Sequence, residues 1–211
     1  MRRFITTTTD CALPSNLILT DDPLRLKMLA AHHMDDVLPF FENRGMLGYS
    51  GSYRGRELAA IACGFGETAT MLYAADAYAL GARTFLYLGE CVSQSPYLKL
   101  MDVIAAVGGS KRLLKKAQTV AKQRRIALPM ERVHTNDAYW LNPETPQGYI
   151  AVDFVSAGFY QTVTSLGAEG LAIFTVSESA VTGERVEESV RQSRFHEAAL
   201  LAFEILAHEQ V

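Results

Sequence analysis

Six short polar segments could carry chemistry, because each stands where an apolar run gives way to a turn or a helical pattern. They contain carboxylates, an arginine, glycines and aromatic side chains, which are the groups that acid–base chemistry and anion binding use. The segments are residues 21–25, 64–68, 89–94, 136–140, 153–156 and 177–179. Because α/β folds bind ligands at the carboxyl ends of their strands, we expect these segments to meet around one site.

The elements that must position these segments alternate between short apolar runs and longer helical patterns. Strands are predicted over residues 16–20, 46–53, 57–63, 84–89, 102–107, 131–135, 149–155 and 170–177. Helices are predicted over residues 23–33, 68–80, 110–125, 156–166 and 184–208. This order predicts one α/β domain over residues 1–211, in which helices flank a three-layer, mixed, mostly parallel twisted sheet.

Composition and charge narrow the classes of partner. The net charge of −3 gives no general attraction for nucleic acid or an anionic membrane. The basic run at residues 111–116 falls on an amphipathic helix pattern, which favours a solvated helix face. No signal peptide or membrane-spanning stretch is evident, so a cytoplasmic protein is expected. The three cysteines and the histidines lack metal-ligand spacing, so no metal site is expected, and Cys63 and Cys91 are expected to be buried free thiols.

Several of the polar segments contain motifs that are more specific than single glycines or carboxylates. Residues 44–56 read RGMLGYSGSYRGR, and residues 21–25, 64–66, 98–103, 156–160 and 175–178 read DDPLR, GFG, LKLMDV, SAGFY and TVSE. In this order they resemble the nucleoside phosphorylase family, above all the hexameric, bacterial-type purine nucleoside phosphorylases. The family's segments are RGMLGFTGTYKGR, GDPLR, GMG, VKLRDV, AAGIY and TVSD. The resemblance covers most of the chain.

The resemblance implies a pentosyltransferase reaction that needs no cofactor. Phosphate cleaves the N-glycosidic bond of a nucleoside and gives a free base and a pentose 1-phosphate. Such a reaction needs an anion site, groups that hold the sugar, and an acid near the base. Glu178 stands where the family has its base-protonating aspartate, and Arg191 matches the arginine that assists this acid. The expected partners are a nucleoside or nucleobase, with neither nucleic acid nor membrane.

The phosphate site departs from the family at several positions. Arg25 and Arg44 match two family arginines, and Arg44 is the one that a neighbouring subunit would lend. This implies a dimer-based homo-oligomer, of which a hexamer is the family form. Asp21, Tyr87 and Glu90 replace a glycine, an arginine and a serine. The added carboxylates and the lost arginine oppose the binding of phosphate. It is therefore left open whether phosphate binds and takes part in the reaction.

The sugar site is also altered, whereas the base site is better retained. Asp153, Phe154 and Val155 match the family's Glu-Met-Glu segment, and Val155 cannot accept hydrogen bonds from ribose hydroxyls. Each lost charge-assisted contact is worth about 1.5–3 kcal/mol. Phe65 replaces a methionine, and Tyr139 falls where the family stacks an aromatic ring on the base. A deoxyribose, another modified sugar or no sugar would fit this site better than ribose.

Three functions remain open at this stage. The first is phosphorolysis of a purine-type nucleoside. The second, a variant of the first, is hydrolysis, in which Asp21 or Glu90 would orient a water. The third is a non-catalytic, nucleobase- or nucleoside-binding paralogue. Simpler interpretations exist for single residues: Asp21 as an outward helix cap, Glu90 as a partner of Arg25, and Glu178 as a solvated loop residue.

Two segments are shorter than in the family. One lies between Val107 and the helix predicted over residues 110–125, and the other spans residues 142–149. Both border the expected pocket or the subunit contacts. Their lengths therefore affect how the pocket is covered and how subunits assemble.

Overall fold

The computed structural model describes residues 12–193 and 195–208, so Cys11 lies outside the described residues. Within them, the strands form one sheet in the order β2-β3-β4-β1-β5-β10-β6-β7, and β9 pairs with both β5 and β8. The strands are β1 (Asn16–Thr20), β2 (Asp35–Asn43), β3 (Met46–Tyr53), β4 (Arg56–Ala62), β5 (Thr84–Ser93), β6 (Val103–Ala106), β7 (Met130–Glu131), β8 (Val133–Thr135), β9 (Ala151–Asp153) and β10 (Glu169–Ser179). The helices are α1 (Pro23–His33), α2 (Glu67–Ala79), α3 (Lys111–Arg124), α4 (Ser156–Ser165), α5 (Glu188–Ser193) and α6 (His196–Ala207).

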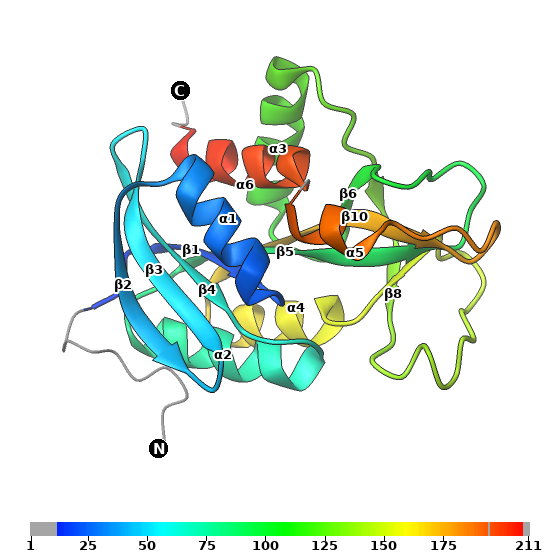
Figure 1. The fold of residues 1–211 in the computed structure, drawn as a ribbon, viewed down its shortest axis with the longest axis horizontal. Helices are drawn as coiled ribbons and strands as arrows, with labels where there is room; N and C mark the ends of the chain where they lie inside the picture. Colours follow the sequence, from blue (N-terminus) through cyan, green and yellow to red (C-terminus); the bar gives the residue numbers. More distant parts are fainter. Residues whose placement is uncertain (1–11, 194, 209–211) are drawn as a thin grey trace.

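Helices cover both faces of the sheet and give the predicted three layers (Figure 1). Strand residues alternate between the two cores: Leu17 and Leu19 pack with α2 and α4, whereas Ile18 packs with α1, α3 and α6. The period of two follows from the pleat, which points successive side chains to opposite faces. Buried apolar residues on both faces of the central strands explain why their sequences read as continuous apolar runs.

The centre of the sheet is parallel, and its carboxyl ends form the edge that carries the site. Strand β1 pairs in parallel with β4 and β5, and β10 pairs in parallel with β5. Strands β2, β3, β6 and β9 add antiparallel pairs. The sheet is therefore mixed and mostly parallel at its core, as predicted.

Three predicted elements needed correction. Strand β2 was not predicted; it lies at one end of the strand order and contains Pro39, as edge strands tolerate. The strand predicted over residues 131–135 is two short strands, β7 and β8. The helix predicted over residues 184–208 is interrupted, and two helices, α5 and α6, replace it. The charged sequence before residue 194 cannot continue the apolar face that α6 buries.

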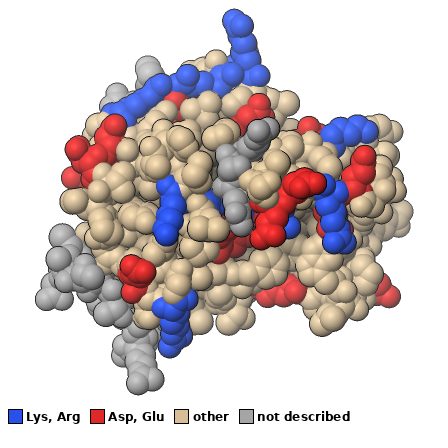
Figure 2. Space-filling model, viewed as in Figure 1, with Lys and Arg blue, Asp and Glu red and all other residues tan. Residues whose placement is uncertain are grey.

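The basic helix α3 lies on the surface as predicted. Leu113, Ala117, Val120 and Ala121 face the core, and the lysines and arginines lie outside it. Figure 2 shows basic side chains gathered along the upper edge, over α3 and the β3–β4 hairpin, with both signs of charge mixed elsewhere on this face. Cys63 and Cys91 are buried free thiols, as expected. No helix in the described part of the chain is long and apolar enough to span a membrane.

Candidate functional site

Arg25 is the centre of a buried group of charges at the carboxyl end of β1. It stands in the first turns of α1, and its side chain is 4% exposed. Nη1 of Arg25 lies 2.5 Å from Oδ1 of Asp21, and Nη2 donates to Oε1 of Glu90. The guanidinium is therefore paired with a carboxylate on two sides. The predicted pairing of Glu90 with Arg25 is confirmed.

The second oxygen of Glu90 is also paired. Oε2 accepts a hydrogen bond from Nε of Arg191 at 2.7 Å and lies 2.6 Å from Nη2 of the same residue. The side chain of Glu90 is 8% exposed, so these are charge-assisted contacts in a region of low dielectric. Two arginines and the two carboxylates Asp21 and Glu90 form this group, which we call the charge cluster. Its formal charges cancel.

Asp21 faces Arg25, and its neighbour Asp22 caps the helix. Oδ1 of Asp22 accepts from the backbone N–H of Leu24 at 2.7 Å and of Arg25 at 3.3 Å. The interpretation of Asp21 as an outward-pointing cap is therefore wrong. Burial raises the pKa of Asp21; Arg25 opposes this shift, and the charge of Glu90 adds to it.

Three further residues complete the surroundings of Arg25. The ring of Phe195 lies 4.9 Å from Cζ of Arg25, and Oγ1 of Thr20 lies 3.4 Å from Nη1. Thr175 stands opposite Glu90 in the β5–β10 register. Nε of Arg25 and Oγ1 of Thr175 are buried and have no hydrogen-bond partner among the described residues. Two polar groups beside the charge cluster thus remain available to a small polar ligand.

Tyr87 fills the hydrophobic core beside the charge cluster and interacts electrostatically with Arg25 and Asp21. It is 2% exposed and packs against Phe159 and Phe174, each with a centroid distance of 5.9 Å. A Cβ at Gly89 would lie 2.5 Å from Cε1 of this ring, so only glycine leaves room for it. The family's arginine is thus replaced by a core side chain.

The aromatic side chains of the predicted base site meet at the ends of several strands. The ring centroids of Phe65 and Phe154 are 4.8 Å apart, and those of Trp140 and Phe154 are 6.0 Å apart. Phe65 is 56% exposed and Trp140 is 53% exposed, whereas Phe154 is buried. We call these three rings the aromatic platform. Tyr139 is buried behind it, and its hydroxyl accepts a hydrogen bond from Nε2 of Gln94 at 3.0 Å.

Glu178 lies near the aromatic platform but pairs with a residue that the sequence did not reveal. Its Oε2 is 3.1 Å from Nε of Arg185, and Cζ of Arg185 is 5.7 Å from the ring centroid of Trp140. The pairing of Glu178 with Arg191 that the resemblance implied is not formed, because Arg191 binds Glu90. The side chain of Glu178 is only 16% exposed, so it is not a solvated loop residue.

Asp153 is a buried capping residue. Its Oδ1 accepts from the backbone N–H groups of Val155 and Ser156, both at 2.6 Å, and Oδ2 accepts from the Ser156 hydroxyl. Thr135 also donates to it, at 3.3 Å. Burial raises the pKa of Asp153 to about 6, although all these hydrogen bonds favour the ionised form. Asp153 therefore fixes the start of α4 and the neighbouring Phe154.

A second cap fixes the loop that carries Phe65. Both side-chain oxygens of Asp137 accept from the backbone N–H of Glu67, at 3.0 and 2.8 Å, at the start of α2. Gly66 has φ of 100°, a region that disfavours side chains, and a Cβ there would lie 3.3 Å from Asp137. The turn after β4 and the loop after β8 are thus tied together, which brings Phe65 and Trp140 to the same edge.

The two parts of the site lie along the same pair of strands. Thr175 is the register partner of Glu90, and Glu178 is three residues further along β10, a separation of roughly 10 Å. Arg44 lies in the β2–β3 turn, is exposed and has φ of 54°. Cavities of about 690 and 380 Å³ lie along β8; neither is lined by Arg25 or Glu178.

Sequence reasoning thus pointed to the residues of the cluster and the platform but missed two residues that contact them. Arg185 and Phe195 were missed, because neither belongs to a matched motif and each reaches the site only through the fold. The described residues hold no group of three or more histidine, cysteine or acidic side chains that could bind a metal ion.

Comparison with known proteins finds relatives that match most of the chain. The chain is 27% identical to a DeoD-type purine nucleoside phosphorylase of Clostridium novyi, over 92% of this chain and 94% of that protein. It is 28% identical to the protein of the same name from Caldanaerobacter subterraneus, over 92% and 95%. Over nearly its whole length the chain is thus similar to DeoD-type purine nucleoside phosphorylases. The relatives' nearly full-length coverage means that the family likeness includes the segments of both the charge cluster and the aromatic platform.

The fold agrees with this similarity. A crystal structure of purine nucleoside phosphorylase from Toxoplasma gondii, in complex with immucillin-H, matches with a TM-score of 0.82. The match covers 93% of this chain and 90% of that chain at 18% identity, and it concerns the fold. No protein-family model matches the chain. The chain therefore shares its fold with that protein.

Proposed function

We propose that this protein cleaves the N-glycosidic bond of a purine-type nucleoside, and that water replaces phosphate as the acceptor. The observation that carries the proposal is the pairing of Glu90 with both Arg25 and Arg191. A carboxylate of the protein thereby occupies the contacts that an anionic acceptor would need. The relatives are named purine nucleoside phosphorylases, and the family's bond cleavage is retained in this proposal.

Electrostatics disfavours phosphate at the charge cluster. Phosphate would have to displace Glu90 from two arginines or bind beside two carboxylates. A unit charge 4 Å from another interacts by about 4 kcal/mol at an effective dielectric constant of 20. Repulsion from Asp21 and Glu90 would cancel much of the attraction to Arg25 and Arg191. A neutral water meets no such penalty.

Asp21 has the properties of a general base for this water. Its pKa is raised, which brings it closer to neutral pH, where proton transfer is most effective. The unpaired Nε of Arg25 and hydroxyl of Thr175 can hold a water by hydrogen bonds. The water oxygen would form a bond to C1′ of the sugar while the bond from C1′ to the base nitrogen breaks. Asp21 would take the proton, and the base would leave with the electron pair.

The departing base would bind against the aromatic platform. Phe65 and Trp140 are each more than half exposed, so a planar base can stack on them. Glu178 would donate the proton that the leaving base requires, and Arg185 holds this carboxyl by its ion pair. Val155 offers no acceptor for ribose hydroxyls, which favours a deoxyribose or another modified sugar.

Isotope labelling tests the acceptor directly. Purified protein is incubated with adenosine, inosine and their 2′-deoxy forms in H₂¹⁸O, with and without phosphate, and the base and sugar products are analysed by mass spectrometry. The proposal expects release of base without phosphate and ¹⁸O at C1 of the free sugar. Asp21→Asn is expected to abolish this release while leaving base binding intact. Pentose 1-phosphate as the main product would instead establish phosphorolysis.

A second candidate function is binding without turnover. The observation that favours it is the diversion of Arg191 to Glu90, which leaves Glu178 without the arginine that assists the acid in the family. Trp140 is the single tryptophan of the chain, so its fluorescence reports directly on bases that stack there. Quenching by purines together with no release of base from any nucleoside would support this candidate and exclude hydrolysis.

We also propose that the protein acts as a dimer-based homo-oligomer in the cytoplasm. Arg44 lies at the tip of the β2–β3 hairpin and is exposed, which suits a residue lent to a neighbouring site. Sedimentation velocity of the protein and of Arg44→Ala, together with their rates of base release, tests both halves of this proposal. If Arg44→Ala loses base release but keeps the size of the oligomer, the result supports a role for Arg44 in the site of a neighbouring subunit.

A further inference from the structure

A cavity of about 380 Å³ lies between β8 and the start of α4. Its volume falls within the range of small-molecule sites. Its walls include Arg132, His134, Thr135, Tyr149, Ser156 and Tyr160. The three platform rings do not line it. We call it the β8 pocket.

One wall of the β8 pocket combines a cation with two neighbouring, tilted rings. Cζ of Arg132 lies 4.7 Å from the ring centroid of Tyr149, and the ring of His134 lies 5.3 Å from the same centroid. Stacking on Tyr149 holds the guanidinium plane and leaves its edge N–H groups available to an acceptor. Such a wall suits a ligand with a planar ring and a negatively charged group.

The charges around the β8 pocket favour an anion. No carboxylate lines this pocket, and Arg132 has no carboxylate partner in the described part of the chain. Arg132 is also exposed, so a ligand can reach it. This contrasts with Arg25, whose guanidinium is neutralised by two carboxylates of the protein.

Two short connections leave the β8 pocket open. Val107 lines it at the point where β6 passes to α3 through only four residues, and Tyr149 lines it at the end of segment 142–149. The resemblance implies that both connections are shorter than in the family.

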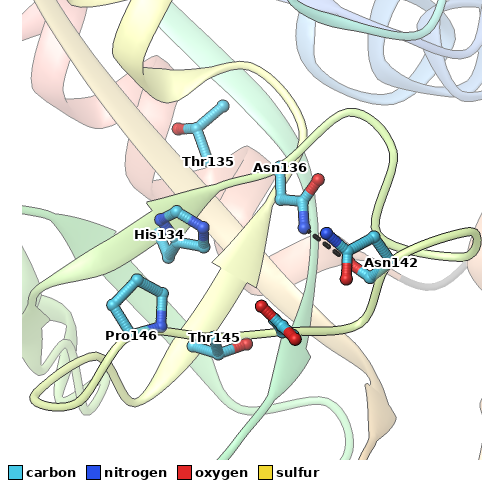
Figure 3. A pocket seen from close by; sticks show the side chains of 7 residues that line it. His134, Thr135, Asn136, Asn142, Thr145 and Pro146 are labelled. Carbon is cyan, nitrogen blue, oxygen red and sulfur yellow. Dashed lines mark hydrogen bonds between the residues drawn. The ribbon is translucent and has the colours of Figure 1, made fainter.

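A larger hollow continues from the β8 pocket. The cavity of about 690 Å³ shares His134 and Thr135 with it and is also lined by Asn136, Glu144 and Thr145 (Figure 3). Figure 3 shows these side chains around one opening along β8, with the Asn136 amide bonded to the backbone carbonyl of residue 142. The hydroxyl of Thr145 is buried without a partner among the described residues. A ligand longer than one ring can therefore extend into polar surroundings.

We propose that the β8 pocket is a second binding site, which takes a planar aromatic anion: a ring that carries a phosphate or a carboxylate group. The ring packs on the Tyr149 wall, and Arg132 binds the anionic group. This inference does not rest on the proposed function, because the aromatic platform and the charge cluster take no part in it.

Calorimetric titration with four probes tests the site and distinguishes the two anionic groups. The probes are adenosine 5′-monophosphate, benzoate, adenosine and inorganic phosphate. A charge-assisted contact of about 1.5–3 kcal/mol corresponds to roughly 10- to 150-fold in affinity. Arg132→Gln is therefore expected to weaken the binding of adenosine 5′-monophosphate, of benzoate or of both by at least about tenfold. The binding of adenosine is expected to stay unchanged. Arg125→Gln, at another exposed arginine, is the matched control and is expected to leave the binding of both anionic aromatic probes unchanged.

Two further variants locate the binding. Tyr149→Leu is expected to weaken the same anionic probe, and Phe65→Ala, on the platform, is expected to leave it bound. Binding that survives Arg132→Gln but is lost in Phe65→Ala would overturn the proposal, since the probe would then use the nucleoside platform. Absence of binding by both anionic aromatic probes at millimolar concentration would overturn it as well.

Discussion

The variant Glu90→Ser tests the electrostatics of the charge cluster. The substitution restores the residue that the family has at this position and removes one carboxylate from between Arg25 and Arg191. The formal charge of the cluster changes from zero to plus one, and the smaller side chain leaves space for an anion. We therefore expect a loss of stability without phosphate and a new response to phosphate.

The expected loss of stability follows from the burial of the ion pair between Arg25 and Glu90. The side chains of Arg25 and Glu90 are 4% and 8% exposed, and removing one partner of a buried ion pair typically costs 3–5 kcal/mol. Asp21 remains as a partner of Arg25, so we expect the lower end, about 3 kcal/mol. In a chain of this length, this corresponds to a fall in melting temperature of roughly 6–12 °C.

Phosphate should then restore much of this loss. A ligand that binds only the native state adds about 2.7 kcal/mol at 100 times its dissociation constant. Thermal unfolding of the parent and of Glu90→Ser, in phosphate and in chloride of equal ionic strength, measures both effects. Glu57→Ser, at an exposed carboxylate, controls for the general effect of removing a negative charge.

Two results would refute this reasoning. If phosphate stabilised the parent as strongly as Glu90→Ser, the carboxylate would not be what keeps phosphate out. A destabilisation below about 1 kcal/mol would show that the pairing of Glu90 with the two arginines contributes little to the native state.

Other substitutions test the supporting structure. The raised pKa of Asp153, about 6 against an ordinary 3.8, means that the native state binds this proton more tightly than the unfolded state. The free energy of unfolding should thus fall by about 3 kcal/mol as the pH rises through this window, and Asp153→Asn should lack that fall in urea titrations. Tyr160→Phe should lower the stability by about 1–3 kcal/mol, since it leaves the Ala172 N–H and the Ala106 carbonyl without their buried partner; an unchanged urea midpoint would contradict this. Phe65→Ala should weaken purine binding about fivefold, read from the fluorescence of the single tryptophan, and equal affinities would argue against stacking.

The sequence predicted the fold well wherever apolar patterns and turn chemistry agreed. Strand β1 and helix α1 lie over the predicted residues, and strand β3 ends at Tyr53, as predicted. Strand β2 escaped prediction because it is a half-exposed edge strand that contains a proline. The interruption between α5 and α6 escaped because the helical pattern was extended through charged residues that cannot continue the apolar face of α6.

The candidate site was predictable in position but not in pairing. Matched motifs located Arg25, Glu90 and Glu178 at strand ends, since those positions follow from the sheet. Which carboxylate binds Arg191 depends on side-chain reach across two strands and a helix, and spacing along the chain carries no information about that. Arg185 was unpredictable for the same reason.

The position of Tyr87 bears on how such a protein can change over evolutionary time. With this ring packed between Phe159 and Phe174, a change to arginine at this position would place a charge in the core. Gly89 is likewise held by the ring, so compensating changes must come from several positions together. Position 87 is therefore closed to stepwise change through single charged substitutions.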